Sequence, residues 1–430
     1  MLKSLFIKLR SSDFIKNSIT LSGGVAVAQF LPMLFYPVLG RVFTAEEFGL
    51  LATITSVTSI LAVVATGKYE SGILIASTKR EAATLAVLSL FISLIFLIVS
   101  YFLLQFVMGD TLSVWLKEPH LRQWLFVCPV AAFSIVVFNV YNEWCVRQKY
   151  FKGLSANKIV NSGAIVLFKT LFGFVKVVPQ GLVVGDTLGR MVSAAVCVVR
   201  ALARDGAEFC KVSFGEMKRC AVKFAEFPKF TMPGQLLNTI GMQFPILFIA
   251  AFFSKADVGH FSMAMAIFAI PITVISGAVR DVFRQRANED YRTQGNCLAI
   301  FKRVTLILSL TALAALAVFV WFLPDLTMLF LGKQWFLAGR YAQYLSVAMA
   351  LSFVSNSLSG VFIVAEKLRA LFYWQVYYVA STLLAVILGG LVFKSMVATM
   401  ILFSLMRGSA YLLSIVMTYI YAKGKTTVSV

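Results

Sequence analysis

Residues 43–49 read FTAEEFG and open an apolar run that continues to Gly67. Residues 253–259 read FSKADVG and open a second apolar run, which continues to Gly277. At an offset of 210 positions the two runs align at Phe43/Phe253, Thr44/Ser254, Glu47/Asp257, Phe48/Val258, Gly49/Gly259 and Gly67/Gly277. The alignment predicts that the chain consists of two related halves.

Each heptapeptide has the pattern of a helix start. Thr44 and Ser254 stand three positions before Glu47 and Asp257, which is the spacing of a capping box, in which the hydroxyl and the acid each accept a hydrogen bond from the other residue's backbone N–H. The acids also complement the positive end of the helix. We predict that these four residues cap the second and eighth spans at the outer face of a membrane. Direct contact with a substrate is the alternative.

The composition is that of a protein that crosses a membrane many times. Of 430 residues, 60% are hydrophobic and 13% charged, against about 45–50% and about 25% in soluble domains. A spanning helix needs roughly 20 apolar residues, and the long runs do not alternate as barrel strands do. Twelve spans are predicted, at 17–40, 46–67, 84–107, 121–142, 158–178, 181–200, 231–253, 258–279, 304–323, 341–363, 371–392 and 396–421.

The distribution of basic residues predicts the topology. With the N-terminus in the cytoplasm, 28 of the 39 lysines and arginines fall in inner segments and eight in outer ones, so the positive-inside rule places both termini in the cytoplasm. The net charge of +20 is then explained by basic loops that face anionic membrane lipid, without any nucleic-acid partner. Because both halves start in the cytoplasm, the pseudo-two-fold axis of the repeat is expected along the membrane normal.

The expected fold is all-α and integral to the membrane, with two six-helix lobes. The predicted parts are a cytoplasmic amphipathic N-terminal segment 1–16, an N-lobe of helices 1–6 at 17–203, a basic cytoplasmic linker 204–229, a C-lobe of helices 7–12 at 230–421 and a cytoplasmic tail 422–430. The six cysteines are scattered and form no Cys-x-x-Cys pair, so we predict neither a disulfide framework nor a metal site.

Four charged residues fall well inside predicted spans, away from the span ends: Lys169, Asp186, Arg190 and Arg407. Charges at membrane depth are costly and are therefore candidates for function. The three cations lie about nine to eleven residues into their spans, near mid-depth. Three cations against one acid predict a cationic, substrate-binding interior that suits a diphosphate and acidic sugars. The alternative is local pairing, since Asp186 and Arg190 stand at positions i and i+4.

Glu70 and Arg280 occupy equivalent places in the repeat. Each lies about 25 residues beyond its cap, which is roughly 39 Å along a helix and reaches the cytoplasmic rim. Our hypothesis is that the two pair across a cytoplasmic gate in an outward-facing state, with Lys68 and Asp281 nearby to share the role. The alternative is that these are unrelated solvated charges.

An ordered set of segments resembles a known family of transporters. The segments are GRVFTAEEFGLLATITSVTSILAVVATGKYESGILIASTKREAA (40–83), YNEWCVRQKYFKGLSANKI (141–159), GLVVGDTLGR (181–190), FPKFTMPGQLLNTIGMQFPILFIAAFFSKADVG (227–259), ISGAVRDVFRQRANED (275–290) and FLGKQWFLAGRYAQYLSVAMALSF (330–353). In this set the chain is similar to the Wzx-type O-antigen flippases among the polysaccharide-biosynthesis transporters. These belong to the multidrug/oligosaccharidyl-lipid/polysaccharide exporter superfamily. One departure is that the family's Arg-Tyr-Glu triplet is Lys68-Tyr69-Glu70 here, which keeps the charge but loses the bidentate fork.

The resemblance implies a fold and a function. The fold would be a MATE-like V shape whose lobes rock between inward-open and outward-open states. The substrate would be an undecaprenyl-diphosphate-linked oligosaccharide repeat unit, moved from the cytoplasmic to the periplasmic leaflet of the bacterial inner membrane. No cofactor is implied, but H+ or Na+ coupling is implied for some members. Partners would be membrane lipids and the polymerase and chain-length regulator of the same pathway.

Two other classes of function remain as alternatives. One is a MATE-like exporter of a small molecule, against which the cationic interior counts. The other is a membrane-embedded polysaccharide polymerase, which would need a large periplasmic loop or clustered acid and base residues. The outer loops at about 108–120 and 324–340 are modest, and we predict no catalytic residues and no enzyme.

Overall fold

The computed structural model describes residues 13–116, 121–176 and 180–424, and every regular element within these ranges is helical. The predicted amphipathic segment 1–16 lies outside the described residues up to residue 12, as does the predicted tail from residue 425 on. The elements are α2 (Asp13–Val42), α3 (Ala45–Val64), η1 (Tyr69–Ile73), α4 (Lys79–Phe102), η2 (Leu103–Val107), α5 (Gly109–Trp115), α6 (Leu121–Leu125), α7 (Val127–Arg147), α8 (Phe151–Val175), α9 (Gly181–Cys210), α10 (Phe214–Lys223), η3 (Phe227–Thr231), α11 (Met232–Phe252), α12 (Lys255–Ile270), η4 (Pro271–Ile275), α13 (Ser276–Gln294), α14 (Leu298–Leu331), η5 (Lys333–Trp335), α15 (Phe336–Leu358), α16 (Gly360–Val364), α17 (Leu368–Ile387), η6 (Leu388–Phe393) and α18 (Met396–Ala422).

Twelve helical segments among the described residues are long and apolar enough to cross a membrane, which confirms the predicted number. The largest difference in bounds concerns the eighth span. It was predicted at 258–279, but the helix runs without interruption from Lys255 to Gln294 through α12, η4 and α13. The sequence of α13 is polar. The end of the apolar run therefore predicted where the membrane-spanning segment ends, but not where the helix ends.

The predicted linker 204–229 is largely helical. α9 continues to Cys210, and α10 follows at Phe214–Lys223. α10 begins with a capping box, in which the side chain of Ser213 accepts from the backbone N–H of Glu216 and the Glu216 carboxylate accepts from that of Ser213. It packs against α4. The connection between the sixth and seventh spans is therefore an ordered surface helix.

Contacts divide the chain into two compact units. Unit 1 consists of Met1–Phe43 and Leu50–Gln243, and unit 2 consists of Thr44–Gly49 and Phe244–Val430. The first turn of α3 thus belongs to unit 2, while the rest of α3 belongs to unit 1.

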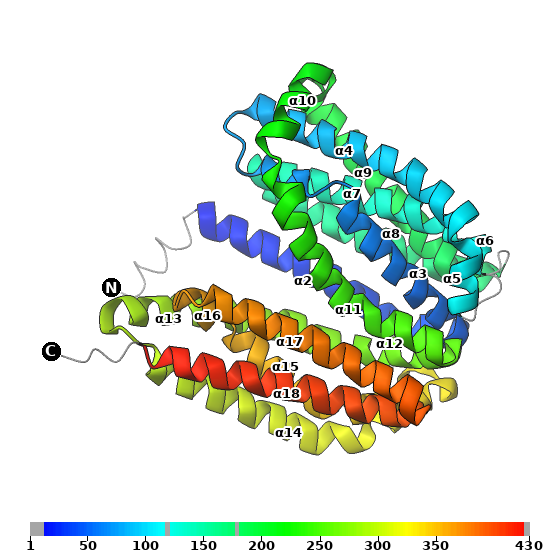
Figure 1. Cartoon of the computed structure of the whole chain (residues 1–430), viewed down its shortest axis with the longest axis vertical. Coiled ribbons are helices and arrows are strands. Elements are labelled where there is room, and N and C mark those ends of the chain that lie inside the picture. The colour runs from blue at the N-terminus through cyan, green and yellow to red at the C-terminus, as the bar shows by residue number, and fades with distance from the viewer. Residues whose placement is uncertain (1–12, 117–120, 177–179, 425–430) are drawn as a thin grey trace. The chain divides into compact units, whose positions relative to one another are not determined.

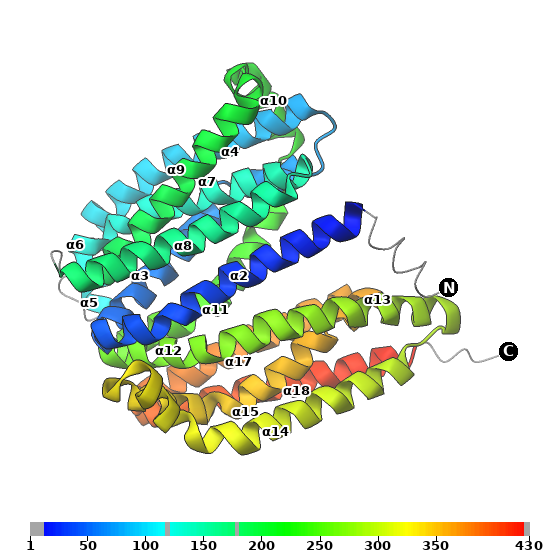
Figure 2. The ribbon, with the colours of Figure 1, turned by 180° about the vertical axis from the view of Figure 1, so that it is seen from behind.

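Corresponding helices pack in the same order within each unit. In unit 1, α8 packs on α9, α9 on α7, and α7 on α4. In unit 2, α17 packs on α18, α18 on α15, and α15 on α14. These are the fifth, sixth, fourth and third spans and their partners six spans later; Figures 1 and 2 show the ribbon from opposite sides. An internal repeat predicts such a match. α2 adds to unit 1 by packing along α8.

Within unit 2, the first turns of α3 and α12 touch at the glycines that end the two heptapeptides. A Cβ atom on Gly49 would lie 2.0 Å from the carbonyl oxygen of Lys255. A Cβ atom on Gly259 would lie 1.8 Å from the carbonyl oxygen of Ala45. Because real Cβ contacts are far longer, these two positions require glycine, and they fix how closely the two helix starts approach.

Each unit has an apolar core of its own. In unit 1 the core gathers around Ile73, Leu85 and Trp144, all of which are fully buried. In unit 2 a core gathers around Phe301 and Leu358.

Candidate functional site

A buried cluster of three charges lies between α8 and α9 in unit 1. The Asp186 carboxylate accepts from Lys169 Nζ at 2.7 Å and from Arg190 Nε at 2.6 Å. The exposed fractions of the three side chains are 15% for Lys169, 9% for Asp186 and 21% for Arg190. The local pairing of Asp186 with Arg190 at i,i+4 is thus present, and Lys169 joins it from the neighbouring helix.

Glycines on α9 bring the two helices together at this cluster. A Cβ atom on Gly185 would lie 2.7 Å from Lys169 Cα, and one on Gly189 would lie 2.4 Å from Ile165 Cα. Small residues spaced by four let helix backbones approach closely in membranes. The close approach places Asp186 within reach of Lys169.

The cluster carries one net positive charge. Two cations surround a single carboxylate, and Tyr36 of α2 lies near enough to Asp186 to interact with its charge. Burying a charge is tolerable when it is paired and hydrogen-bonded. An anion that replaced Asp186 between Lys169 and Arg190 would meet two donors already in place.

The structure places Arg407 in unit 2, inside an aromatic cage between α17 and α18. The residue is 7% exposed, and its guanidinium carbon lies 4.9 Å from the ring centre of Tyr378 and 4.8 Å from that of Phe403. One guanidinium nitrogen donates to the Tyr378 hydroxyl. The Nε atom has no hydrogen-bond partner among the described residues. Cation–π contacts stabilise a desolvated cation. The contacts with Tyr378 and Phe403 therefore stabilise the buried Arg407 charge, a role that a carboxylate plays for Lys169 and Arg190.

The four residues of the hypothetical gate have neighbours within their own units. In unit 1, Lys68 Nζ lies 3.2 Å from Glu70 Oε1, and Glu70 is only 5% exposed. Its second oxygen, Oε2, has no partner in the described part of the chain. In unit 2, Arg280 Nε lies 3.9 Å from Asp281 Oδ1, and both side chains are exposed. Among the described residues, Glu70 therefore retains an acceptor without a partner, and the Arg280 side chain is exposed.

The two heptapeptides have the geometry of capping boxes. The Glu47 carboxylate accepts from the backbone N–H of Thr44 at 2.8 Å, and the Thr44 hydroxyl accepts from that of Glu47 at 3.3 Å. Ser254 and Asp257 repeat this exchange at 3.2 and 3.1 Å. The other oxygen of Asp257 accepts from the Tyr341 hydroxyl at 2.7 Å, so this cap also ties α12 to α15.

Sequence reasoning missed the residues that surround these charges. Tyr378 was not predicted as a partner of Arg407, although an aromatic run, Trp374 with Tyr377 and Tyr378, marks its span. Asp205 was also missed. It is buried, accepts from Trp144 Nε1 and Lys79 Nζ at 3.0 Å each, and has non-helical backbone angles inside α9. Its acidic charge directly after Arg204, in a predominantly basic segment, was the available signal.

A metal site is not indicated by the side chains that the structure describes. Among them, no group of three or more His, Cys, Asp or Glu residues is placed to hold a metal ion. The polar groups of the candidate site are the ion-paired Lys169, Asp186 and Arg190 and the aromatic-packed Arg407.

Comparison with protein families identifies a match over most of the chain. A family model described as "Polysaccharide biosynthesis protein" matches residues 38–338, which is more than half of the chain. No curated protein matches the sequence.

Solved structures share the fold. The chain is similar to the lipid II flippase MurJ in an inward closed conformation, with a TM-score of 0.74 and 12% identity over 94% of this chain and 87% of that one. It is similar to a multidrug resistance MATE family transporter of the MOP superfamily in an inward-facing conformation, with a TM-score of 0.63 and 17% identity over 94% of each chain. A MOP superfamily transporter from Pyrococcus furiosus matches with a TM-score of 0.58 and 16% identity over 95% of each chain. The fold is therefore MurJ- and MATE-like.

Proposed function

Since the chain belongs to the polysaccharide biosynthesis protein family, we propose that it flips an undecaprenyl-diphosphate-linked oligosaccharide repeat unit from the cytoplasmic to the periplasmic leaflet of the bacterial inner membrane. The product serves O-antigen or another surface polysaccharide. Transport proceeds by alternating access of the two lobes, 17–203 and 230–421, which are joined by the basic segment 204–229. Both termini lie in the cytoplasm.

The observation that carries this proposal is the excess of buried cations. Lys169 and Arg190 share one carboxylate, Asp186, and Arg407 has aromatic neighbours instead of an acid. A diphosphate is a strong multidentate acceptor, and charge-assisted hydrogen bonds from Lys and Arg are the strongest that a protein offers to phosphate. A transporter for drug cations would need acidic groups in these places.

The roles of the three cations differ in the proposal. Lys169 and Arg190 donate to the diphosphate when the substrate enters, and the Asp186 carboxylate that they release takes up a proton, so that no buried charge is left unpaired. Arg407 offers the unpaired Nε as a further donor, in a planar fork that suits phosphate. H+ or Na+ drives the cycle, and the polymerase and chain-length regulator of the pathway receive the product.

A strain without this protein is expected to lose its surface polysaccharide and to accumulate lipid-linked repeat units in the cytoplasmic leaflet. The measurement is a gel of surface polysaccharide together with extraction of the lipid-linked units from inverted and right-side-out vesicles. The wild-type chain supplied in trans is the control and restores the polysaccharide. Unchanged surface polysaccharide in the deletion strain would refute the flippase proposal.

We also propose that Glu70 and Arg280 pair across the cytoplasmic gate in the outward-facing state. Glu70 Oε2 is the free acceptor that such a pair requires; Lys68 and Asp281 share the role.

Glu70→Arg and Arg280→Glu are each expected to lower export at least tenfold, and the double variant is expected to recover part of that export. Quantified surface polysaccharide checks this, with Glu46→Arg as a control far from the gate. A double variant no better than the single ones contradicts the pairing.

The second candidate is export of a small molecule, because the fold is also that of a multidrug resistance transporter. It predicts that the deletion strain becomes more sensitive to toxic compounds while its surface polysaccharide is intact. The deletion experiment above therefore separates the two candidates in one strain.

A further inference from the structure

α10 is held to unit 1 by its inner face. Arg80 of α4 donates to Glu216 at 2.9 Å and to the backbone carbonyls of Glu208 and Lys211, and Lys223 pairs with Glu81. The hydrogen bonds from Arg80 lower the pKa of the Glu216 carboxyl to about 2. The only acid within α10 is thus ionised and engaged on this inner face.

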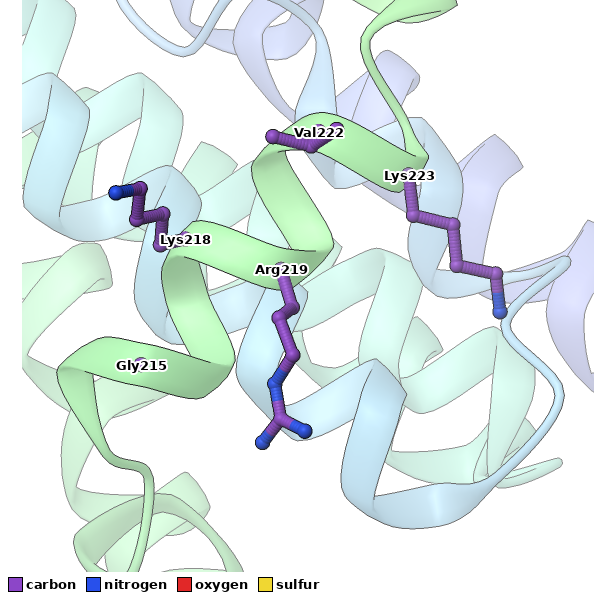
Figure 3. A pocket seen from close by; sticks show the side chains of 5 residues that line it. All are labelled: Gly215, Lys218, Arg219, Val222 and Lys223. Carbon is purple, nitrogen blue, oxygen red and sulfur yellow. The ribbon is translucent and has the colours of Figure 1, made fainter.

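The outer face of α10 is basic and uncovered. Gly215, Lys218, Arg219, Val222 and Lys223 line a shallow depression of about 390 Å³ (Figure 3). Val222 is 73% exposed, and Lys218 and Arg219 are exposed and have no carboxylate partner among the described residues. Two free cations thus stand beside exposed apolar surface.

Contacts with α4 indicate the depth of α10 in the membrane. The ring of Phe214, which is 69% exposed, makes an edge contact with Phe91 of α4 at 6.4 Å. The span that begins with α4 runs over 29 residues, from Lys79 to Val107, whereas about 20 cross the hydrocarbon. Its first turn carries Lys79, Arg80 and Glu81, which form ion pairs with α9 and α10, so this charged end of α4 is expected at the membrane surface. Phe214 therefore adds an apolar ring, beside the apolar part of α4, to a helix whose charges lie at that end.

We propose that the outer face of α10 is a docking surface for anionic phospholipid, whose headgroups are held by Lys218 and Arg219 at the depression that both residues line. Helices that lie in the interface combine apolar and basic residues on the side that meets lipid, and each basic residue near an anionic surface contributes about 1 kcal/mol. Phe214 and Val222 supply the apolar surface. Lys218 and Arg219 supply the positive charge that complements the anionic headgroup. The site is separate from the transported substrate and holds whether or not the proposed function is correct.

The test uses the full-length protein purified in detergent and titrated with phosphatidylglycerol, with phosphatidylcholine as the neutral lipid. Retained lipid is counted by native mass spectrometry. Lys218→Gln combined with Arg219→Gln is expected to weaken phosphatidylglycerol binding about 30-fold, since two basic residues at about 1 kcal/mol each correspond to that factor. Phosphatidylcholine binding is unchanged.

Two matched variants sharpen the result. Lys302→Gln combined with Arg303→Gln removes the same charge from another exposed basic pair and is expected to leave phosphatidylglycerol binding unchanged. Gly215→Glu adds an acid inside the depression, where a Cβ atom meets nothing within 4 Å, so it weakens binding without a steric clash. Gly215→Ala serves as its control and binds normally.

Three outcomes would overturn the proposal. Equal weakening by the two charge-removing pairs would mean that net charge alone attracts the lipid. Equal affinity of the wild type for both lipids would exclude recognition of the anionic headgroup. Binding of inorganic phosphate as tightly as phosphatidylglycerol would make the depression a site for a soluble anion.

Discussion

Lys169→Ala and Arg407→Ala are each expected to abolish surface polysaccharide while the protein stays in the membrane at its normal level. Truncating one partner of a buried, hydrogen-bonded charge pair costs about 2–5 kcal/mol, which is about 30-fold or more in affinity. A diphosphate bound between Lys169 and Arg190, or at Arg407, would lose a contact of this kind. The measurement is surface polysaccharide against membrane protein level by immunoblot.

Controls separate loss of substrate binding from loss of folding. Lys169→Ala leaves Asp186 paired with Arg190, at 2.6 Å, so it strands no buried charge. Lys169→Met keeps most of the side-chain volume without the charge: it should fail like Lys169→Ala if the charge binds substrate, and regain export if lost packing is the cause. Arg407→Lys keeps the charge without the planar fork and is expected to fall between wild type and alanine. Wild-type export from both alanine variants would refute the role of the cations.

Gly259→Ala is expected to lower the thermal stability of the purified protein sharply, whereas Gly277→Ala is not. Both glycines lie in the same continuous helix, and alanine gains about 1 kcal/mol in helix propensity at either position. At Gly259, however, the added Cβ would lie 1.8 Å from the carbonyl oxygen of Ala45, and at Gly277 it meets nothing within 4 Å. Overpacking costs about 1–3 kcal/mol and occasionally more, and the gain in propensity cancels, so the difference between the variants should be about 1–3 kcal/mol or more.

Unfolding followed by intrinsic fluorescence in detergent checks this difference. Gly49→Ala tests the same contact from the other helix, since its Cβ would lie 2.0 Å from the carbonyl oxygen of Lys255. We expect it to behave like Gly259→Ala. Equal melting temperatures for Gly259→Ala and Gly277→Ala would contradict the close approach of the two helix starts.

The fold was predictable because a membrane span can be recognised from the amino-acid composition of a short segment. Apolar length gave the twelve spans, and the aligned heptapeptides gave the repeat. The bounds predicted from apolarity were too short where polar residues continue a helix. The polar residues of α13 extend the eighth helix from the predicted end at 279 to Gln294. α10 likewise forms within the predicted linker, because capping and backbone hydrogen bonds hold a helix together outside the membrane.

The site was predictable only where its partners are close in sequence. Asp186 and Arg190 share a helix turn, so their pairing could be foreseen. The partnership of Arg407 with Tyr378 joins α18 to α17, and that of Asp205 with Trp144 joins α9 to α7. Such contacts depend on how far one helix is shifted and rotated against another, which no local pattern in the sequence records.

The division of α3 between the two units has a consequence for biogenesis. Proteins generally fold from the N-terminus while synthesis continues, but Thr44–Gly49 packs in unit 2, against residues made about 210 positions later. Until Lys255–Gly259 has been synthesised, the first turn of the second span has no packing partner from unit 2. Packing of the second span is therefore expected to be complete only after the eighth span has been inserted into the membrane.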